Sequence, residues 1–333
     1  MREVVLTGVK PTGMPHIGNY FGAIKPAIDL AQKGQGEGWL FIADYHSLIS
    51  LHRPQELNQM IYEVAASWLA CGLDPEKTVI YRQSDIPELM ELNWILSCLC
   101  PKGLMNRAHA YKAKVQENKE HGREDLDFGV NMGLYNYPVL MSADILMFNA
   151  THVPVGADQL QHLEIARDLA EKFNNTFEEF FVLPQAVLSE KTKIIPGIDG
   201  RKMSKSYGNH LPLFEDAKSL RKKVMKIVTD SSAPEEPKDP DHSLLFDMYR
   251  FVATPEEVKA MEKKYKEGIG WGYVKQDLFD ALERLIQPMR EKYQEFMNNK
   301  DQMDRILSEG AAKARPRASE NLRKIRKAIG LSR

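Results

Sequence analysis

Short hydrophobic runs alternate with helical patterns over the first two-thirds of the chain. Runs rich in β-branched and aromatic residues predict strands at residues 4–6, 39–42, 79–81, 153–155 and 180–183. Helical patterns predict helices over about 19–32, 54–73 and 159–173. Because strands separated by helices pair in parallel and are covered on both faces, this part is expected to be an α/β domain.

After Ser206 the pattern becomes helical and charged. It is interrupted by residues 230–240, a proline- and serine-containing stretch that cannot form one helix. We therefore expect two domains, at residues 1–206 and 207–333. Residues 101–131 are polar and rich in lysine, and we interpret them as an insertion or a mobile loop at the edge of the sheet. Disorder is the alternative for this segment.

The end of the chain is locally basic. From Lys313 onward there is one acid, Glu320, against eight basic residues: Lys313, Arg315, Arg317, Arg323, Lys324, Arg326, Lys327 and Arg333. Such a segment is compatible with contact to RNA. The alternative is an amphipathic helix that packs on the body of the protein through Leu322, Ile325 and Ile329.

Composition narrows the class of protein. The 333 residues are 43% hydrophobic, enough for a substantial core, and the net charge of −1 gives no overall attraction to a polyanion. Cys71, Cys98 and Cys100 form no Cys-x-x-Cys pair, which fits a reducing compartment and argues against a zinc ribbon or an iron–sulfur site. The first residues predict a strand and not a signal peptide, and no apolar run approaches the roughly 18 residues of a membrane span, so we expect a soluble cytoplasmic protein without a membrane partner.

The first candidate motif is the turn between the first predicted strand and the helix after it, Pro11-Thr12-Gly13-Met14-Pro15-His16-Ile17-Gly18-Asn19. The amino terminus of a helix binds anions through its unpaired N–H groups and the positive end of its dipole. Gly18 allows a nucleotide base to approach the backbone closely. His16 and Asn19 can donate hydrogen bonds to phosphate oxygens. The alternative is a tight turn with a surface histidine.

The second candidate motif is Lys202-Met203-Ser204-Lys205-Ser206, after a glycine-containing approach at residues 196–201. Two lysines three positions apart, with small hydroxyl residues among them, suit a mobile loop that closes over a triphosphate. A solvated basic loop is the alternative. Together with the first motif, this loop predicts an ATP site in which phosphate charge is stabilised from two sides.

The two motifs resemble the hallmark motifs of the class I aminoacyl-tRNA synthetases. The segments 137–146 (YPVLMSADIL) and 153–162 (VPVGADQLQH) resemble the bacterial tryptophanyl-tRNA synthetases more narrowly, and this resemblance runs almost from end to end. It implies a Rossmann-type catalytic domain to about Ser206 and a helical anticodon-binding domain after it. It also implies L-tryptophan, ATP and tRNA(Trp) as substrates, Mg²⁺ bound with ATP and not fixed by the protein, and a homodimer.

The resemblance assigns a tryptophan-binding set. Asp144 matches the residue that accepts a hydrogen bond from the indole N–H, and a carboxylate suits this task because indole offers a donor and no acceptor. A site that demands such a bond can discriminate against phenylalanine by roughly 10⁴–10⁵. The whole set comprises Leu6, His46, Tyr137, Met141, Asp144, Val155 and Gln159.

The resemblance also assigns the ATP site. The catalytic residues would be His16, Lys202, Ser204 and Lys205. The ATP-binding set comprises Lys10, Pro11, Thr12, Gly13, Gly18, Asn19, Lys114, Gly156, Ala157, Asp158, Ile194, Lys202, Met203, Ser204, Lys205 and Ser206. Among these, Lys114 would reach the phosphates from the middle segment.

Three positions depart from the family pattern. Lys10 stands where glutamine is common, and Ala157 stands where an acid is common. Ala110 takes the place of a glutamine that contacts the amino acid, with His109 as a possible substitute. These departures imply altered handling of ATP and magnesium and one altered contact to the amino acid.

Four other functions are compatible with parts of the sequence. A tyrosine-specific synthetase shares the fold and both motifs, although the context of Asp144 favours tryptophan. A small-molecule nucleotidyltransferase shares the histidine turn but has no need of a second domain. A non-catalytic paralogue is disfavoured by the intact His16, Lys202 and Lys205. An RNA-binding module would use the basic end of the chain, which explains none of the ATP site.

Overall fold

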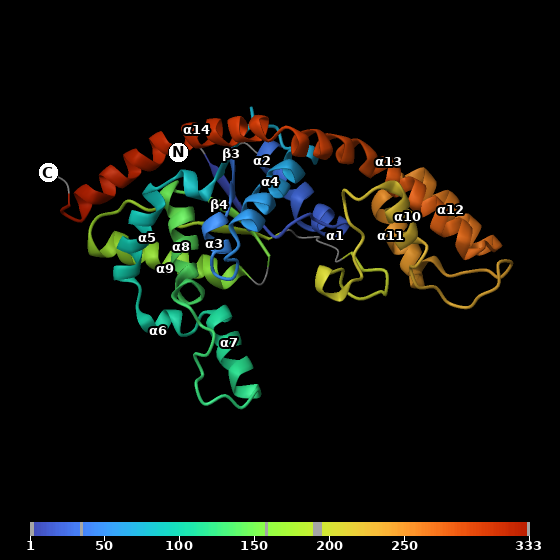
Figure 1. Ribbon diagram of the computed structural model, residues 1–333, viewed down its shortest axis with the longest axis horizontal. Coiled ribbons are helices and arrows are strands. Elements are labelled where there is room, and N and C mark those ends of the chain that lie inside the picture. Colours follow the sequence, from blue (N-terminus) through green and yellow to red (C-terminus); the bar gives the residue numbers. More distant parts are fainter. Residues whose placement is uncertain (1–2, 34–35, 157–158, 189–194, 332–333) are drawn as a thin grey trace.

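A five-stranded parallel sheet forms the centre of the protein (Figure 1). The computed structural model describes residues 3–33, 36–156, 159–188 and 195–331. The strand order is β3-β2-β1-β4-β5. The strands are β1 (Val4–Val9), β2 (Glu37–Ile42), β3 (Thr78–Arg82), β4 (His152–Val155) and β5 (Gln185–Leu188). The α/β class and the parallel sheet predicted from the sequence are confirmed.

The fifth strand lies further along the chain than predicted. Residues 180–183 are irregular, and β5 begins at Gln185. Asparagine side chains satisfy the backbone of this segment in place of a strand ladder: Asn174 Oδ1 accepts from the N–H groups of Phe180 and Phe181, at 3.0 and 2.9 Å. Phe181 is buried among the core side chains. The hydrophobic run therefore reflects packing and not strand pairing.

Helices cover both faces of the sheet. Along β2, Leu40 and Ile42 face a core shared with α4 (Pro54–Ala70), whereas Trp39 and Phe41 face the other core, as expected from the alternation of side chains along a strand. That second core is shared with α5 (Glu88–Leu99), α8 (Met132–Met147) and α9 (Leu160–Thr176).

The helix after β1 is not continuous. It consists of α1 (Ile17–Asn19), a π-helical segment η1 (Tyr20–Ile24) and α2 (Lys25–Lys33). The sequence pattern predicted one helix here. A π turn within an α-helix is uncommon and is frequent at functional sites, and this one lies directly after the first motif.

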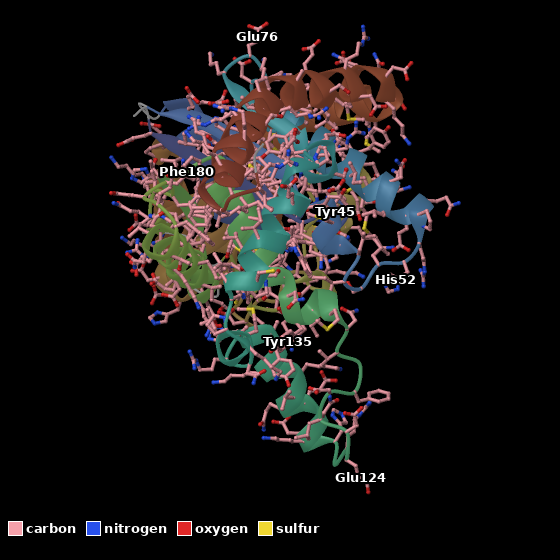
Figure 2. All side chains as sticks on the ribbon, turned by 90° about the vertical axis from the view of Figure 1, so that its left-hand side faces the viewer. Tyr45, His52, Glu76, Glu124, Tyr135 and Phe180 are labelled. Carbon is pink, nitrogen blue, oxygen red and sulfur yellow. The ribbon has the colours of Figure 1, made fainter. Side chains whose placement is uncertain are left out.

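The polar middle segment is helical and projects from the body (Figures 1 and 2). It contains α6 (Lys102–Met105) and α7 (His109–Glu120). Asn118, which is fully buried, donates from Nδ2 to the carbonyls of Leu126 and Phe128 at 2.8 and 2.9 Å and so fastens the returning loop to α7. The prediction of a loop or of disorder is wrong for residues 102–105 and 109–120, which are helical, whereas the prediction of an insertion is compatible with a unit that projects from the body.

The second part of the chain is helical, as predicted. Its helices are α10 (Ala217–Val224), α11 (Leu244–Val252), α12 (Pro255–Glu267), α13 (Trp271–Asn298) and α14 (Lys300–Ala328). The apolar side chains of α11 and α13 belong to the same core cluster as those of α4. Helix α14 then returns across the first part of the chain and lies along β3, at the edge of the sheet (Figure 1).

Helix α14 lies unusually close to β3. A Cβ atom placed on Gly310 would be 1.7 Å from the carbonyl oxygen of Ile80, so only glycine fits there. Near the end of the helix, Asn321 Nδ2 donates to the carbonyl of Met147 at 2.8 Å. Leu322 is buried in the core that covers the second face of the sheet.

The basic residues of α14 also contact the body of the protein. Arg315 pairs with Glu88 at 3.4 Å, Arg317 with Glu37 at 3.2 Å, and Arg326 with Glu91. Ile325 is buried and Ile329 packs against the same core. Of the two interpretations of the basic end, the structure therefore supports the amphipathic helix that packs on the body.

The three cysteines are free thiols. Burial raises the pKa of the Cys71 thiol to about 12, so that this sulfur stays protonated and inert near neutral pH. None of the described helices combines the length and the low polarity that a bilayer crossing requires.

Candidate active site

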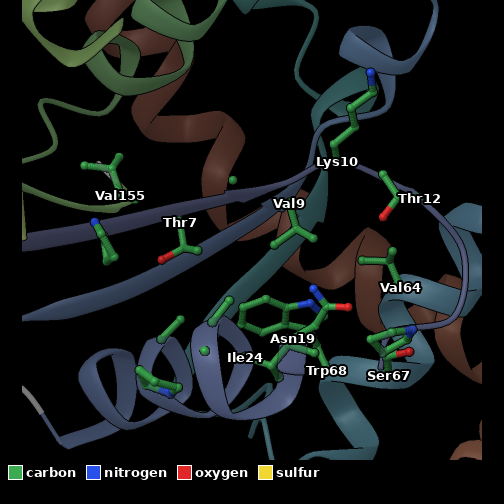
Figure 3. A pocket seen from close by; sticks show the side chains of 18 of the residues that line it. Thr7, Val9, Lys10, Thr12, Asn19, Ile24, Val64, Ser67, Trp68 and Val155 are labelled. Carbon is green, nitrogen blue, oxygen red and sulfur yellow. The ribbon is translucent and has the colours of Figure 1, made fainter. Parts of the chain in front are cut away.

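A large cavity lies at the carboxyl ends of β1 and β4 (Figure 3). The chain runs from β1 to β2 on one side, and β4 pairs with β1 on the other side. Such a switch point is the usual ligand site of an open parallel sheet. The cavity has a volume of about 980 Å³ and is lined by residues of both strands, the first motif, α2 and α4, among them Val9, Gly13, Asn19, Trp68, Val155 and Gly156.

The first motif forms the wall of this cavity through a capped helix start. His16 is the N-cap of α1, and its ring Nδ1 accepts a hydrogen bond from the backbone N–H of Asn19 at 3.1 Å. Asn19 returns a bond, because its Oδ1 accepts from the backbone N–H of His16 at 3.0 Å. This reciprocal capping holds both side chains at the turn.

The capping bond also determines which ring nitrogen of His16 carries the proton. Because Nδ1 accepts from a backbone N–H, the neutral ring carries its proton on Nε2, which is thereby a donor. Burial lowers the pKa of His16 to about 4, and the nearby His210 and Lys205 act in the same direction. His16 is therefore a neutral hydrogen-bond donor at pH 7, as a group facing phosphate oxygens should be.

Hydrogen bonds join the first motif to the second motif and to the segment that follows it. The N–H of Ile17 donates to the carbonyl of Leu211 at 2.9 Å, and the N–H of Leu213 donates to the carbonyl of Pro15 at 3.1 Å. The Nζ of Lys205 reaches the carbonyl of Thr12 at 2.9 Å. The two motifs, far apart in the sequence, thus lie on one site.

Asn209 organises the loop of the second motif. It is buried, its Oδ1 accepts from the N–H of Ser204 at 2.8 Å, and its Nδ2 donates to Asp199 at 2.7 Å and to the carbonyl of Lys202 at 3.1 Å. Ser204 in turn caps a single 3₁₀ turn, η4 (Lys205–Tyr207), by accepting from the N–H of Ser206.

The two lysines of the second motif have different surroundings. Burial lowers the pKa of Lys205, and the charge of Glu63 opposes this effect. Lys202 is exposed, as is Ser206, whereas Met203 between them is buried and packs under the loop. The loop is thus held to the body through Met203 and Lys205, whereas Lys202 is exposed.

The predicted tryptophan-binding residues of α8 and the β2 end lie at the same edge of the sheet. Asp144 is 1% exposed, and its Oδ2 lies 3.2 Å from Nε2 of His46, in the short helix α3 (Asp44–Ser47). Burial raises the pKa of Asp144, whereas hydrogen bonds from His46 and Gln83 oppose the effect. The site therefore contains a desolvated acceptor that is supplied with donors.

Two more residues of the predicted set share a second network. Tyr137 Oη lies 2.6 Å from His162 Nε2, and His162 Nδ1 lies 2.9 Å from Gln159 Oε1. The rings of His46 and Tyr137 have their centroids 6.1 Å apart, which connects this network to Asp144. His46, Tyr137, Asp144 and Gln159 are therefore brought together by the fold.

Other predicted residues are placed differently. Val155, Gly156, Lys10, Thr12 and Gly13 line the cavity, although the side chain of Lys10 extends away from Val9 and Trp68 (Figure 3). Pro11 belongs to the turn of the first motif and Gly18 to α1, and Met141, on α8, packs against the core of the second face.

Five other predicted residues lie in the core, on the projecting helix α7 or outside the described chain. Leu6 is fully buried in the core and is not among the cavity residues. Lys114 lies on the projecting α7, where its Nζ pairs with Glu117 at 3.0 Å. Ala157, Asp158 and Ile194 lie outside the residues that the structure describes.

Sequence analysis missed three side chains at the site: Gln83, His162 and Asn209. Gln83 directly follows β3 and is fully buried. A polar side chain at the carboxyl end of a parallel strand was the signal that could have identified it. His162 and Asn209 stand within or next to the recognised motifs, but their partners are visible only in the structure.

The site offers donors and acceptors and no metal cage. In the described part of the chain, no group of three or more His, Cys, Asp and Glu side chains is arranged to hold a metal ion. The first motif lines the cavity through Thr12, Gly13, Pro15 and Asn19, and it carries His16 and the contact with Lys205. A helix amino terminus, a neutral imidazole and a lysine at one place suit an anionic ligand such as a nucleotide.

Comparisons with known proteins agree with this geometry. Residues 2–287 match the family of tRNA synthetases class I (W and Y). A tryptophan--tRNA ligase of Neisseria meningitidis is 54% identical over 99% of this chain and 98% of its own length. A tryptophan--tRNA ligase of Pseudomonas aeruginosa is 52% identical over 99% of this chain and 74% of its own length.

Solved structures give the same result. A tryptophanyl-tRNA synthetase of Campylobacter jejuni, crystallised with ADP and tryptophan, is 43% identical, covers 98% of this chain and all of its own, and superposes with a TM-score of 0.90. The structure of the Mycoplasma pneumoniae enzyme is 28% identical with a TM-score of 0.79, over 100% of this chain and 99% of its own. The chain therefore belongs to the tryptophanyl-tRNA synthetase family, within the class I tRNA synthetases.

Proposed function

We propose that the chain attaches L-tryptophan to tRNA(Trp) at the expense of ATP. The observation that carries the proposal is the joining of the two motifs, through Lys205 and Thr12, beside a nucleotide-sized cavity. A buried acceptor, Asp144, lies at the same edge of the sheet. Full-length relatives at 54% identity that are tryptophan--tRNA ligases support the choice of tryptophan over tyrosine.

The reaction has two steps. In the first, the carboxylate of tryptophan attacks the α-phosphorus of ATP, which forms an acyl–phosphate bond and releases pyrophosphate. In the second, a terminal ribose hydroxyl of the tRNA attacks the carbonyl carbon of the adenylate, which forms the ester and releases AMP. No protein nucleophile is needed because the carboxylate is already ionised at pH 7. Catalysis then consists of positioning and stabilisation of phosphate charge.

The residues have distinct proposed roles. His16 donates from Nε2 to a phosphate oxygen, and Lys202 and Lys205 stabilise the negative charge that grows on the leaving pyrophosphate. The loop leaves its contact with Thr12 to do so. Mg²⁺ bound with ATP would supply further neutralisation of the phosphate charge, and none of the described residues is assigned to hold it.

The amino-acid pocket has its own proposed roles. Asp144 accepts from the indole N–H, Met141 and Val155 pack on the ring, and Tyr137 and Gln159 bind the ammonium group. Leu6 and His46 complete the pocket. These assignments rest on the family pattern together with the networks around Asp144 and Tyr137.

Three further properties belong to the proposal. We propose a catalytic unit at residues 1–206 and an anticodon-binding unit at 207–333. We also expect a cytoplasmic homodimer, which sedimentation of the purified protein would test. For the ATP site, we propose that Lys114 reaches the phosphates. This requires a movement of α7, because the ammonium group of Lys114 pairs with Glu117 in the structure.

ATP–pyrophosphate exchange with each of the twenty amino acids tests the function. We expect exchange with tryptophan alone. Exchange with tyrosine and none with tryptophan would contradict the specificity, and no exchange with any amino acid would favour a non-catalytic paralogue.

A further inference from the structure

Gln83 connects three segments around the buried carboxylate. It follows β3 as the first residue of the 3₁₀ turn η2 (Gln83–Asp85) and is 0% exposed. Its Oε1 accepts from the backbone N–H of Tyr45 at 3.1 Å. Its Nε2 donates to both oxygens of Asp144, at 2.8 Å each. Gln83 thus joins the end of β3 to α3, which carries His46, and to α8, which carries Asp144.

The orientation of the Gln83 amide follows from its partners. A backbone N–H can only donate, so the side-chain oxygen must face Tyr45. The NH₂ group must then face Asp144, where an ionised carboxylate accepts and a neutral carboxyl group would place a proton against a donor. The geometry of Gln83 is therefore matched to the charged form of Asp144.

The charged form needs this support. Burial disfavours it, as does the charge of Asp44 nearby. The groups that face Asp144 are His46 from α3, Tyr81 from β3 and Gln83 from η2. Of these, only His46 and Gln83 donate hydrogen bonds to it and lower its pKa.

The 3₁₀ turn that carries Gln83 is itself fixed on both sides. Ser84 donates to Asp44 from its backbone N–H at 3.0 Å and also from its hydroxyl. Arg82 donates to Asp85 at 2.9 Å and to Asp304 of α14 at 3.1 Å. Helix α14 thereby holds the strand end from which Gln83 projects.

We propose that Gln83 is a positioning residue for amino-acid recognition, which keeps Asp144 ionised and turned so that one carboxylate oxygen can accept the indole N–H. The inference rests on the proposed function, because it takes tryptophan as the ligand of Asp144. It assigns specificity to a side chain that acts through Asp144 and need not touch the substrate.

Equilibrium dialysis with labelled tryptophan, between about pH 5.5 and pH 8.5, tests the inference. The full-length protein would be compared with Gln83→Met, which keeps the volume and removes the donor. We expect binding about tenfold weaker or more at neutral pH. We also expect affinity to rise with pH, because Asp144 without its donor ionises only at higher pH.

For a second variant, Gln83→Glu, we predict the opposite dependence of tryptophan affinity on pH. The introduced carboxyl can share one proton with Asp144 at low pH and repels it once both are ionised. Affinity should then fall as pH rises. Two nearly isosteric variants with opposite pH slopes separate an effect on ionisation from a general loss of structure, and a melting curve of each variant verifies that it folds.

A double-mutant cycle identifies the group that titrates. In an Asp144→Asn background, Gln83→Met should add no further pH dependence, and any slope that persists belongs to groups other than Asp144. Gln32→Met is the matched control, because Gln32 makes amide hydrogen bonds to Gly72 and Asp74 outside the site.

The outcomes distinguish the two proposals. If the unmodified protein does not bind tryptophan, the proposed function is wrong. If it binds tryptophan and folded Gln83→Met binds equally well with an unchanged pH profile, the role of Gln83 is wrong.

Discussion

His16 has two features that suit its proposed contact with a phosphate oxygen: a proton on Nε2 and a ring that stays neutral near pH 7. Its pKa is lowered to about 4 from the model-compound value of 6.5 by burial and by the charges of His210 and Lys205. We predict that its ring protons show a titration midpoint close to pH 4 in an NMR titration. A midpoint near 6.5 would mean that the ring is solvated or paired with an acid.

The lowered pKa of His16 also affects stability. Between about pH 6.5 and pH 4 the unfolded chain binds a proton at this position and the folded chain does not. The contribution of His16 therefore makes the protein less stable as the pH falls through this range. Replacement of His16 by asparagine should reduce the slope of unfolding free energy against pH, as measured by urea denaturation at several pH values.

Lys205 should matter for the chemical step and not for tryptophan binding. Its ammonium group contacts the first motif and no residue of the Asp144 network. We predict that Lys205→Ala slows adenylate formation by about 10²–10³-fold, as for the loss of one transition-state donor, and leaves the affinity for tryptophan unchanged. Single-turnover kinetics and equilibrium dialysis measure the two quantities.

A lysine elsewhere provides the control for this variant. Lys263 is exposed on α12 and pairs with Glu267, so Lys263→Ala should change neither quantity. Weakened tryptophan binding in Lys205→Ala, with normal adenylate formation, would reverse the assigned roles.

Site residues of unusual chemical type could be identified from the sequence, whereas residues whose importance depends on their contacts in the fold could not. His16 and Lys205 are unusual residues for the turns in which they lie, and Asp144 is an acid within an apolar run. Each can therefore be recognised from the sequence alone. Gln83 and Asn209 are ordinary amides in the sequence. Their importance arises from burial and from partners up to 61 positions away.

At the scale of elements, the contact between α14 and β3 depends on one missing side chain. A Cβ on Gly310 would overlap the carbonyl of Ile80, which belongs to a strand and cannot move aside. We predict that Gly310→Ala lowers the free energy of unfolding by about 3 kcal/mol, at the upper end for overpacking. Thermal and chemical denaturation measure this change.

Gly272 offers a matched substitution in a helix of the same part of the chain. It lies in the first turn of α13, and an added Cβ there would meet no atom within 4 Å. Gly272→Ala should therefore change stability by no more than about 1 kcal/mol. Equal effects of the two substitutions would mean that α14 does not lie as close to β3 as described.

Periodicity predicted the elements whose side-chain pattern is regular. Helix α4 and strands β1 to β4 lie close to the predicted positions, because the helix has an apolar face and the strands are apolar runs covered on both faces of the sheet. The pattern failed where other interactions decide the backbone. Asn174 takes over the N–H groups of the expected fifth strand, and Asn118 folds a polar segment into a projecting helical unit.

At the scale of the whole molecule, α14 protects the open edge of the sheet. It lies along β3, and its apolar side chains complete the core on the second face. We predict that a chain ending at Asn298 loses solubility and its cooperative thermal transition, because an unpaired edge strand and apolar surface become exposed. Soluble yield and circular dichroism measure the effect.

A shorter truncation is the control. Removal of residues 330–333 leaves the buried residues of α14 in place, so solubility and melting should be unchanged. A soluble, cooperatively melting chain that ends at Asn298 would show that the sheet does not need this helix.

The return of α14 to β3 has a consequence for the order of events during synthesis. Arg82 and its partner Asp304 are 222 positions apart. At translation rates of roughly 5–20 residues per second, the ribosome needs on the order of ten to forty seconds to make the second after the first. During that interval the nascent sheet carries an uncovered edge, so a growing chain of this protein is a natural client for ribosome-associated chaperones until its last helix emerges.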